Sequence, residues 1–212
     1  GAAIVVATYF GAKDEKHMKK AIGGTVLIGI CFSICVSALC LVFLSPILKF
    51  LNISEEIMPQ AKVYIGIILA GLLASTLYNI CAAILRAVGD SFTPLIFLIV
   101  ASFLNIGLDY GFILGFHMGV EGAALATVLS QAVSAFLCFL YMKKKYPQLM
   151  LTKEDRKAEK EIYKKLLSSG LAMSFMISFV TLGTLALQTS INTFGTNIIV
   201  AHTAARKATS VF

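Results

Sequence analysis

Long apolar runs separated by short polar stretches dominate this sequence. An apolar run of about 20 residues is long enough to cross a bilayer as a helix. The runs predict complete spans at residues 21–46, 63–87, 94–116, 123–142 and 166–194, with partial spans at residues 2–10 and from residue 198 onwards. The pattern therefore predicts an all-α, polytopic helical membrane protein that has no room for a large water-exposed domain.

The polar stretches between these runs carry turn and capping signals. Within residues 48–62, we expect Ser54 to cap a helix whose first turn holds two glutamates. Gly89-Asp90 indicates a turn, and Thr93-Pro94 indicates a helix cap followed by proline at the first helical position. Residues 153–165 are predicted to form an amphipathic helix on the membrane surface.

The central run, from Pro94 to Phe116, contains the one carboxylate that apolar sequence surrounds on both sides, Asp109. Asn105 lies four residues earlier, so the two side chains share a helix face, which Ser102 extends. A charge deep in hydrocarbon costs about 2.5 kcal/mol or more, so Asp109 indicates a functional group that faces a cavity or a polar partner. The alternative is a packing hydrogen bond between helices. The opposite side of the helix is predicted to pack on a neighbour through Gly107, Gly111 and Gly115.

Composition and charge agree with a membrane protein. The 212 residues are 58% hydrophobic and only 14% charged, whereas charged residues make up about a quarter of a soluble domain. The net charge of +7 arises between the apolar runs, which argues for membrane topology rather than for nucleic-acid binding. Fourteen of the eighteen Lys and Arg residues fall in three loops on one side of the spans, at residues 11–20, 86–93 and 143–165. We therefore expect these loops to be cytoplasmic and the protein to lie in the inner (plasma) membrane.

Signatures of enzymes and metal sites are missing from the sequence. The three histidines are isolated, no glycine-rich phosphate loop is present, and the five cysteines lie inside apolar runs without a CxxC pair. We expect no enzyme activity, no metal and no cofactor. The groups that can surround Asp109 are amides and hydroxyls, namely those of Asn105, Ser102, Asn79, Gln131 and Gln188. Such a set suits reversible binding of H⁺ or Na⁺, because burial raises the pKa of a carboxyl while nearby donors lower it.

Several stretches of the chain together resemble the multidrug and toxic compound extrusion (MATE) family. They keep the family's order along the sequence, and they are Gly11–Asp14, Ala83–Pro94, Leu104–Tyr110, Gly119–Thr127 and Phe194–Ala205. The resemblance implies twelve helices in two six-helix lobes, of which this chain would run from late helix two to early helix eight. The N-terminal lobe would then occupy residues 1–142, a basic linker residues 143–165, and the start of the C-terminal lobe residues 166–212. Because the chain begins and ends within apolar runs, we expect a piece of a longer protein, monomeric at full length.

The same resemblance implies a cation-coupled antiporter that exports organic cations or amphipathic drugs. Asn105 and Asp109 match the amide and carboxylate positions of the fifth helix in the DinF-like branch, where they belong to an ion-coupling network. An acidic partner on the first helix would lie before Gly1. The NorM-like branch carries a glutamate in its seventh helix, whereas residues 166–194 contain no acid. The alternatives are a flippase of lipid-linked saccharides from the same superfamily and a membrane scaffold subunit without transport.

Overall fold

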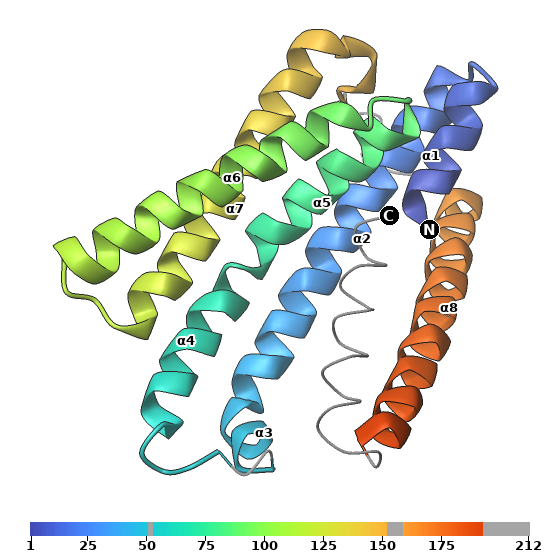
Figure 1. The fold of residues 1–212 in the computed structure, drawn as a ribbon. Helices are drawn as coiled ribbons and strands as arrows, with labels where there is room; N and C mark the ends of the chain where they lie inside the picture. Colours follow the sequence, from blue (N-terminus) through green and yellow to red (C-terminus); the bar gives the residue numbers. More distant parts are fainter. Residues whose placement is uncertain (51–52, 152–158, 193–212) are drawn as a thin grey trace. The chain divides into compact units, whose positions relative to one another are not determined.

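The computed structural model describes residues 1–50, 53–151 and 159–192 (Figure 1). Contacts divide the chain into two compact units, residues 2–167 and a second unit of Gly1 with the residues from 168 onwards. Every regular element in the described residues is helical. The α-helices are α1 (Ala2–Gly11), α2 (Glu15–Val42), α3 (Leu44–Phe50), α4 (Met58–Ala70), α5 (Leu72–Ala87), α6 (Phe92–Tyr110), α7 (Val120–Lys145) and α8 (Lys160–Asn192). A π-helical turn, η1 (Gly111–Gly115), extends α6, and a 3₁₀ turn, η2 (Pro147–Leu149), follows α7.

The helices of the first unit pack in a row. α2 lies against α5, α5 against α7, and α7 against α6; in Figure 1 these helices are blue, blue-green, yellow and light green. The apolar core is concentrated where α2 begins and where α5 and α7 end. Its most buried large side chains include Met18, Ile22, Ile84, Leu85 and Leu149. This core therefore lies at the ends of these helices to which the basic loops are connected.

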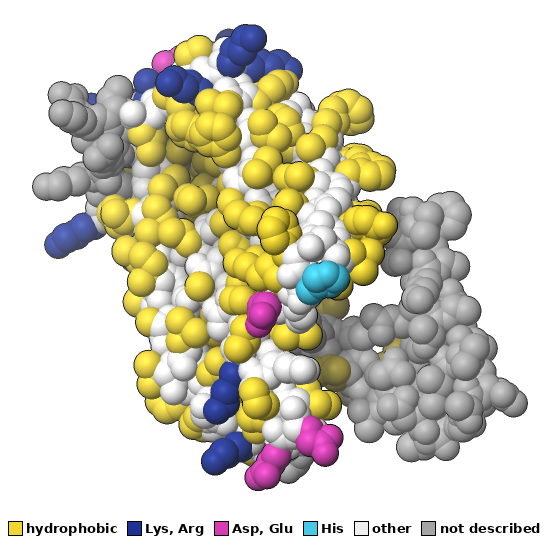
Figure 2. Space-filling view, turned by 90° about the vertical axis from the view of Figure 1, so that its left-hand side faces the viewer, with side chains coloured by type: hydrophobic (Ala, Val, Ile, Leu, Met, Phe, Trp, Pro, Cys, Tyr) yellow, Lys and Arg dark blue, Asp and Glu magenta, His cyan; other side chains and the backbone are white. Residues whose placement is uncertain are grey.

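Among the described residues, four helical segments are long and apolar enough to cross a membrane, in agreement with the predicted polytopic class. They are Glu15–Val42, Phe92–Gly115, Val120–Lys145 and Lys160–Leu187, and a bent pair, α4 with α5, passes the same test. Figure 2 shows hydrophobic side chains over the middle of the face that carries α6, with Lys and Arg near both ends and most of them at the upper end. Little of this apolar surface is buried inside the protein, which is expected where hydrocarbon rather than water is the solvent.

The span predicted as one helix over residues 63–87 is instead two helices. α4 and α5 meet at Gly71 with a bend of 40°. Gly71 is buried, and a Cβ atom added there would lie only 2.2 Å from a methyl group of Val128 on α7. The close approach of the Val128 side chain to the backbone at the bend requires glycine there, and glycine is also the residue that tolerates a break in a helix best.

Three predicted helix starts are wrong in detail. Ser54 does not cap a helix: its backbone carbonyl accepts hydrogen bonds from the amides of Ile57 and Met58, and α4 begins only at Met58. Thr93 does not cap α6; the Asp90 carboxylate caps it by accepting a hydrogen bond from the Thr93 amide at 3.1 Å.

The third wrong start lies in the first basic loop. The predicted loop at residues 11–20 is largely helical, because α2 begins at Glu15 after the Asp14 side chain accepts a hydrogen bond from the His17 amide. A carboxylate at this position stabilises the positive end of the helix dipole as well as its first free amides.

The predicted surface helix at residues 153–165 does not exist as a separate element in the described part of the chain. Residues 152–158 lie outside the described residues, and Lys160–Lys165 forms the first turns of α8. The predicted turn at residues 195–197 and the span after it also lie outside the described residues.

Candidate functional site: a carboxylate on α6 facing α7

Small side chains bring α6 and α7 together. Ala101 on α6 and Ala124 and Ala126 on α7 are almost fully buried. One hydrogen bond crosses directly between the helices in this part, from the Ser134 hydroxyl to the Phe97 carbonyl oxygen at 2.9 Å. Small residues and short hydroxyl side chains at a helix contact let two backbones approach closely inside a membrane.

A second polar contact joins the same two helices further along. The side-chain amide of Asn105 on α6 donates a hydrogen bond to the Thr127 hydroxyl oxygen on α7 at 3.5 Å. The Thr127 hydroxyl in turn donates to the Ala123 carbonyl oxygen of its own helix at 3.0 Å. Asn105 and Thr127 are both half-buried. The Asn105 side chain is thereby directed toward α7 rather than toward the hydrocarbon.

Asp109 lies one helical turn beyond Asn105 on the same face. Its Oδ1 atom is buried and has no hydrogen-bond partner among the described residues. Buried polar atoms in folded proteins nearly always have a partner, and an unpaired one costs about 1–3 kcal/mol, or more if it is charged. The carboxylate is therefore a group that an arriving proton or cation would stabilise.

The polar side chains that we expect near this carboxylate are amides and hydroxyls, not metal-binding clusters. Within the described residues, no three His, Cys, Asp or Glu side chains come together as they do in a transition-metal site. Carboxylate, amide and hydroxyl oxygens are hard ligands, which suit H⁺, Na⁺ and similar ions and not soft metals. The side chains of Asp109, Asn105 and Thr127 carry oxygen atoms of this hard kind.

The other residues expected at this site have different surroundings. Ser102 is exposed on α6, one turn before Asn105. Asn79 is exposed on α5 and donates its side-chain amide to the Ser75 carbonyl oxygen of its own helix at 2.8 Å. Gln131 is half-buried on α7, one turn beyond Thr127 and on the same face. Gln188 falls within α8, and its side chain lies outside the described part of the chain.

The glycine side of α6 does not pack as predicted. A Cβ atom added at Gly107, Gly111 or Gly115 would meet nothing within 4 Å in the described residues. The last two of these glycines bound the π-helical turn η1, in which the Phe116 amide donates to the Gly111 carbonyl oxygen at 3.1 Å. π-helical turns are rare and occur often beside functional sites. Here the turn begins two residues after Asp109.

A polar cluster that the sequence did not predict lies at the opposite end of α6 and α7. The Asp90 carboxylate, before α6, accepts hydrogen bonds from the Tyr141 and Tyr146 hydroxyls at 3.1 and 3.2 Å. The Lys145 ammonium lies 3.6 Å from the same carboxylate oxygen and donates to the Tyr141 hydroxyl at 2.6 Å. Partial burial raises the pKa of Asp90, but the hydrogen bonds from Thr93 and Tyr141 outweigh burial and hold its pKa below the ordinary value.

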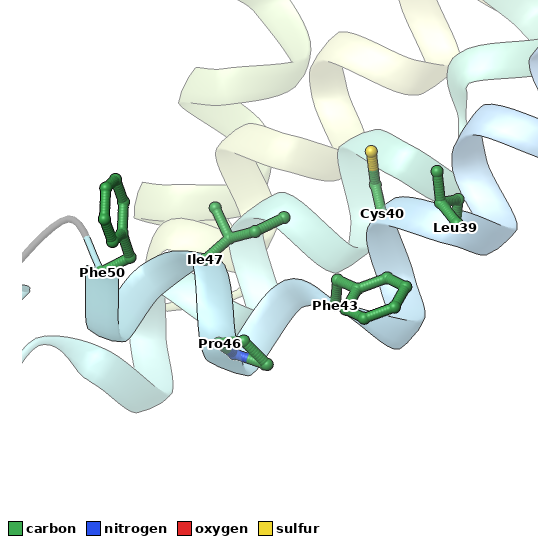
Figure 3. A pocket seen from close by; sticks show the side chains of 6 residues that line it. All are labelled: Leu39, Cys40, Phe43, Pro46, Ile47 and Phe50. Carbon is green, nitrogen blue, oxygen red and sulfur yellow. The ribbon is translucent and has the colours of Figure 1, made fainter.

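The chain also contains an apolar notch where α2 meets α3. It has a volume of about 440 Å³ and is lined by Leu39, Cys40, Phe43, Pro46, Ile47 and Phe50. Figure 3 shows Cys40 of α2 with Ile47 and Phe50 of α3 on the same side of this elbow. None of these six side chains is charged. Its six lining side chains include no carboxylate, amide or hydroxyl group of the kind found at the α6–α7 contact.

Comparison with known proteins identifies the family. Residues 1–111 match the family described as MatE, which is more than half of the chain. The chain belongs to the MATE family. This family comprises transporters and not enzymes, as the sequence predicted, and the all-helical polytopic fold is that of MATE structures. A crystal structure of a MATE protein in the bent conformation superposes on the whole chain with a TM-score of 0.88 at 26% identity, and the match covers 48% of that protein.

The curated relatives of this MATE chain are about twice as long as the chain itself. A probable multidrug resistance protein of Bacillus subtilis, YpnP, is 31% identical over 203 residues, which is 95% of this chain and 45% of the relative. A probable multidrug resistance protein NorM of Thermotoga maritima is 35% identical over 154 residues, 70% of this chain and 33% of the relative. The DNA damage-inducible protein F of Escherichia coli is 27% identical over 140 residues. Both NorM and DinF proteins thus match, so the comparison assigns the family and not the branch.

Proposed function

We propose that this chain is part of a cation-coupled MATE antiporter in which Asp109 binds the coupling ion, H⁺ or Na⁺. The observation that carries the proposal is the buried, unpaired Oδ1 atom of Asp109, one turn beyond the Asn105–Thr127 hydrogen bond. A proton would neutralise this carboxylate, and a sodium ion would be coordinated by it together with neighbouring amide or hydroxyl oxygens. Either event changes the charge of a group that faces the protein interior.

The transported substrates in this proposal are organic cations or amphipathic drugs. The names of the relatives support it, because YpnP and NorM are both described as probable multidrug resistance proteins. Coupling follows from competition: a cationic substrate and the coupling ion that share one carboxylate cannot both occupy it, so inward movement of the ion drives outward movement of the drug. The full-length protein would act as a monomer in the lipid bilayer.

The basic loops set the proposed orientation. With residues 11–20, 86–93 and 143–165 on the cytoplasmic side of the plasma membrane, α6 begins at the cytoplasmic surface. At 1.5 Å per residue, Asp109 then lies roughly 22 Å beyond Pro94, in the outer half of the membrane. At this depth the short carboxylate side chain does not reach the headgroups, so its access to ions depends on a water-filled path through the protein.

Within the family, the proposal favours the DinF-like branch. Residues 166–194 contain no acidic residue, so a coupling carboxylate of the kind that NorM-like proteins carry in the seventh helix is missing there. The carboxylate that remains inside an apolar span is Asp109, on the fifth helix in the numbering of the family. An acidic residue on the first helix would complete the network, and determination of the sequence before Gly1 tests for it directly.

Transport by the full-length protein in proteoliposomes tests the proposed function. A fluorescent organic cation would be followed under an imposed H⁺ or Na⁺ gradient for the wild type, for Asp109→Asn, and for Glu121→Gln as a control. Glu121 is an exposed carboxylate in the first turn of α7, so its replacement removes the same charge from the same hairpin. We expect Asp109→Asn to lose gradient-driven transport by about tenfold or more and Glu121→Gln to retain it. Transport by Asp109→Asn with unchanged ion dependence would refute the assignment.

A further inference from the structure

The membrane span formed by α4 and α5 is broken at Gly71, where the two helices meet with a bend of 40°. A break interrupts the regular pattern of backbone hydrogen bonds, and inside a bilayer water does not replace them. The Leu69 carbonyl oxygen, two residues before the bend, accepts a hydrogen bond from the Ser37 hydroxyl of α2 at 2.6 Å. The bend is therefore fixed to α2 on one side.

On its other side, the bend is in contact with α7. A Cβ atom added at Gly71 would lie 2.2, 2.6 and 2.9 Å from Cγ2, Cγ1 and Cβ of Val128, whereas carbon atoms in ordinary contact are about 3.5–4.0 Å apart. Rotation of the valine side chain cannot make room, because its own Cβ atom is one of the three, and a β-branched side chain in a helix is confined almost to one rotamer. Any side chain at Gly71 therefore displaces the backbone of α7 relative to the bend.

Val128 is the next residue after Thr127, which faces Asn105 of α6. The Asn105–Thr127 hydrogen bond is 3.5 Å long, whereas such bonds are usually about 2.7–3.2 Å. On the α6 side, α7 is closely packed through buried alanines, so a displacement of α7 at Val128 has to be a rotation or a slide. Either movement changes the position of Thr127 relative to Asn105, and a hydrogen bond of this length has little tolerance for it.

The bend and Asp109 lie at the same depth in the proposed membrane orientation. The loop at residues 88–91 connects α5 to α6, so distances along both helices can be measured from the same surface. α5 has 16 residues, so Gly71 lies roughly 24 Å from that loop at 1.5 Å per residue. Asp109 lies roughly 22 Å beyond Pro94 on α6. The contact of Gly71 with Val128 is therefore in the same layer of the first unit as the candidate ion site.

We propose that Gly71 is a positioning residue for the ion site: because the bend carries no side chain, Val128 packs against its backbone and α7 presents the Thr127 hydroxyl to Asn105. This inference rests on the proposed function, because it makes ion affinity depend on the geometry beside Asp109. Neither Gly71 nor Val128 has a side-chain group that binds an ion, so their effect on ion binding passes through the position of Thr127. Coupling of this kind is demonstrated by a double-mutant cycle.

Such a cycle in the full-length protein combines Gly71→Ala with Thr127→Val. The ion concentration at half-maximal transport is measured in proteoliposomes with Na⁺, or with H⁺ where Na⁺ has no effect. If Gly71 acts through the Thr127 hydroxyl, its replacement has no further effect once that hydroxyl is gone. We expect each single variant and the double variant to need about fivefold more ion than the wild type, whereas independent effects would multiply to about 25-fold and overturn the inference.

Gly29→Ala is the matched control for crowding alone. An added Cβ atom at Gly29 of α2 would lie 2.5 Å from Cδ1 of Ile80, and its nearest neighbours belong to α5. We expect this variant to stay within about twofold of the wild type in ion affinity, because it crowds a helix contact without pushing on Val128. An equal loss of ion affinity in Gly29→Ala and Gly71→Ala would show a general effect of crowding and overturn the positioning role.

Val128→Ala provides a rescue that also covers poor folding of Gly71→Ala. It removes the two methyl groups at 2.2 and 2.6 Å from the added Cβ atom and leaves only the Cβ atom of residue 128, at 2.9 Å. We expect Gly71→Ala/Val128→Ala to return to within about twofold of the wild-type ion affinity. Recovery of thermal stability in detergent without recovery of ion affinity would show that the contact serves packing alone.

Asp109→Asn, measured beside these variants, separates the two proposals. If it loses ion-dependent transport while the losses from Gly71→Ala and Thr127→Val multiply, the proposed function stands and only the positioning role is wrong. If it transports with unchanged ion dependence, the proposed function is wrong, and the positioning role with it. Loss in Asp109→Asn together with equal ion affinity in Thr127→Val and the double variant is the result that we expect.

Discussion

The side-chain amide of Asn105 donates a hydrogen bond to the Thr127 hydroxyl across the contact between α6 and α7, at 3.5 Å. Thr127 is oriented by a bond of its own, to the Ala123 carbonyl oxygen. One turn away, Oδ1 of Asp109 is buried without a partner in the described structure. The amide of Asn105 and the unpaired carboxylate of Asp109 therefore lie one turn apart on α6, and the Thr127 hydroxyl faces the amide from α7.

Thr127→Val keeps the shape of the side chain and removes its hydroxyl. We expect the affinity for the coupling ion to fall by about fivefold, because one hydrogen bond is worth about 1 kcal/mol. The ion concentration at half-maximal transport by the full-length protein measures this change. Thr127→Ser retains the hydroxyl and should behave like the wild type. Equal ion affinity in the valine and serine variants would show that the hydroxyl has no part in ion binding.

The Asp90 cluster makes stability depend on pH. The pKa of Asp90 is lower in the folded protein than in the unfolded chain, so its charged form stabilises the fold at neutral pH. This contribution is complete above the unfolded pKa of about 3.9 and is lost as the pH falls through the lower, folded pKa. Asp90→Asn removes the charge that Tyr141, Tyr146 and Lys145 surround.

We expect Asp90→Asn to lower the free energy of unfolding by about 1–3 kcal/mol at neutral pH, as for a lost hydrogen bond to a charged group. Thermal unfolding in detergent, followed from neutral pH to below about pH 4, measures the effect. The gap between wild type and variant should close at the acidic end, and Glu121→Gln, at an exposed site, should show no such gap. A gap that stays constant with pH would show that the Asp90 charge does not stabilise the fold.

Gly71 permits the close contact between the α4–α5 bend and α7. An added Cβ atom would lie 2.2 and 2.6 Å from the two methyl groups of Val128, so the helices must move apart in Gly71→Ala. We expect a loss of about 1–3 kcal/mol in the free energy of unfolding, as for other overpacked sites. Gly66→Ala, in α4, is the control, because a Cβ atom there meets nothing within 4 Å in the described residues. Equal thermal stability of the two variants would show that the bend does not depend on glycine.

The membrane-spanning helices were predictable because hydrocarbon imposes one simple pattern. α7, at Val120–Lys145, contains the span predicted at residues 123–142, and α6 with η1, at Phe92–Gly115, covers almost all of the span predicted at residues 94–116. Apolar length alone fixes such segments. The bend at Gly71 was missed because a single glycine within an apolar run is compatible with a straight helix, and only the approach of Val128 shows why it is needed here.

The helix starts were less predictable because several polar residues compete for each one. Ser54 had the expected sequence context for a cap, but its backbone carbonyl closes a turn and α4 begins four residues later. At the start of α6, the Asp90 carboxylate caps the helix by accepting a hydrogen bond from the Thr93 amide, and the Thr93 side chain does not. Asp90 also binds two tyrosine hydroxyls that lie more than 50 residues away in sequence, a contact that no local pattern contains.

The candidate site was predictable in part. The four-residue spacing placed Asn105 and Asp109 on one helix face, and the structure directs that face toward α7. Thr127 was not predicted as the partner of Asn105, because it ends a run of small residues that is typical of a packing surface. Asn79 was expected nearby, but its amide bonds its own helix, a common alternative for a polar side chain in an apolar span. The role of Asp109 as an ion site stays a prediction.

The exchange of ion for substrate on the purified full-length protein tests that role most directly. Addition of a saturating organic cation should release about one proton, detected in weakly buffered solution, or about one sodium ion, detected with a sodium electrode, per wild-type protein. The account predicts that Asp109→Asn releases neither and that Glu121→Gln releases the same ion as the wild type. Release of about one ion by Asp109→Asn would contradict the account, because the ion would then be bound elsewhere.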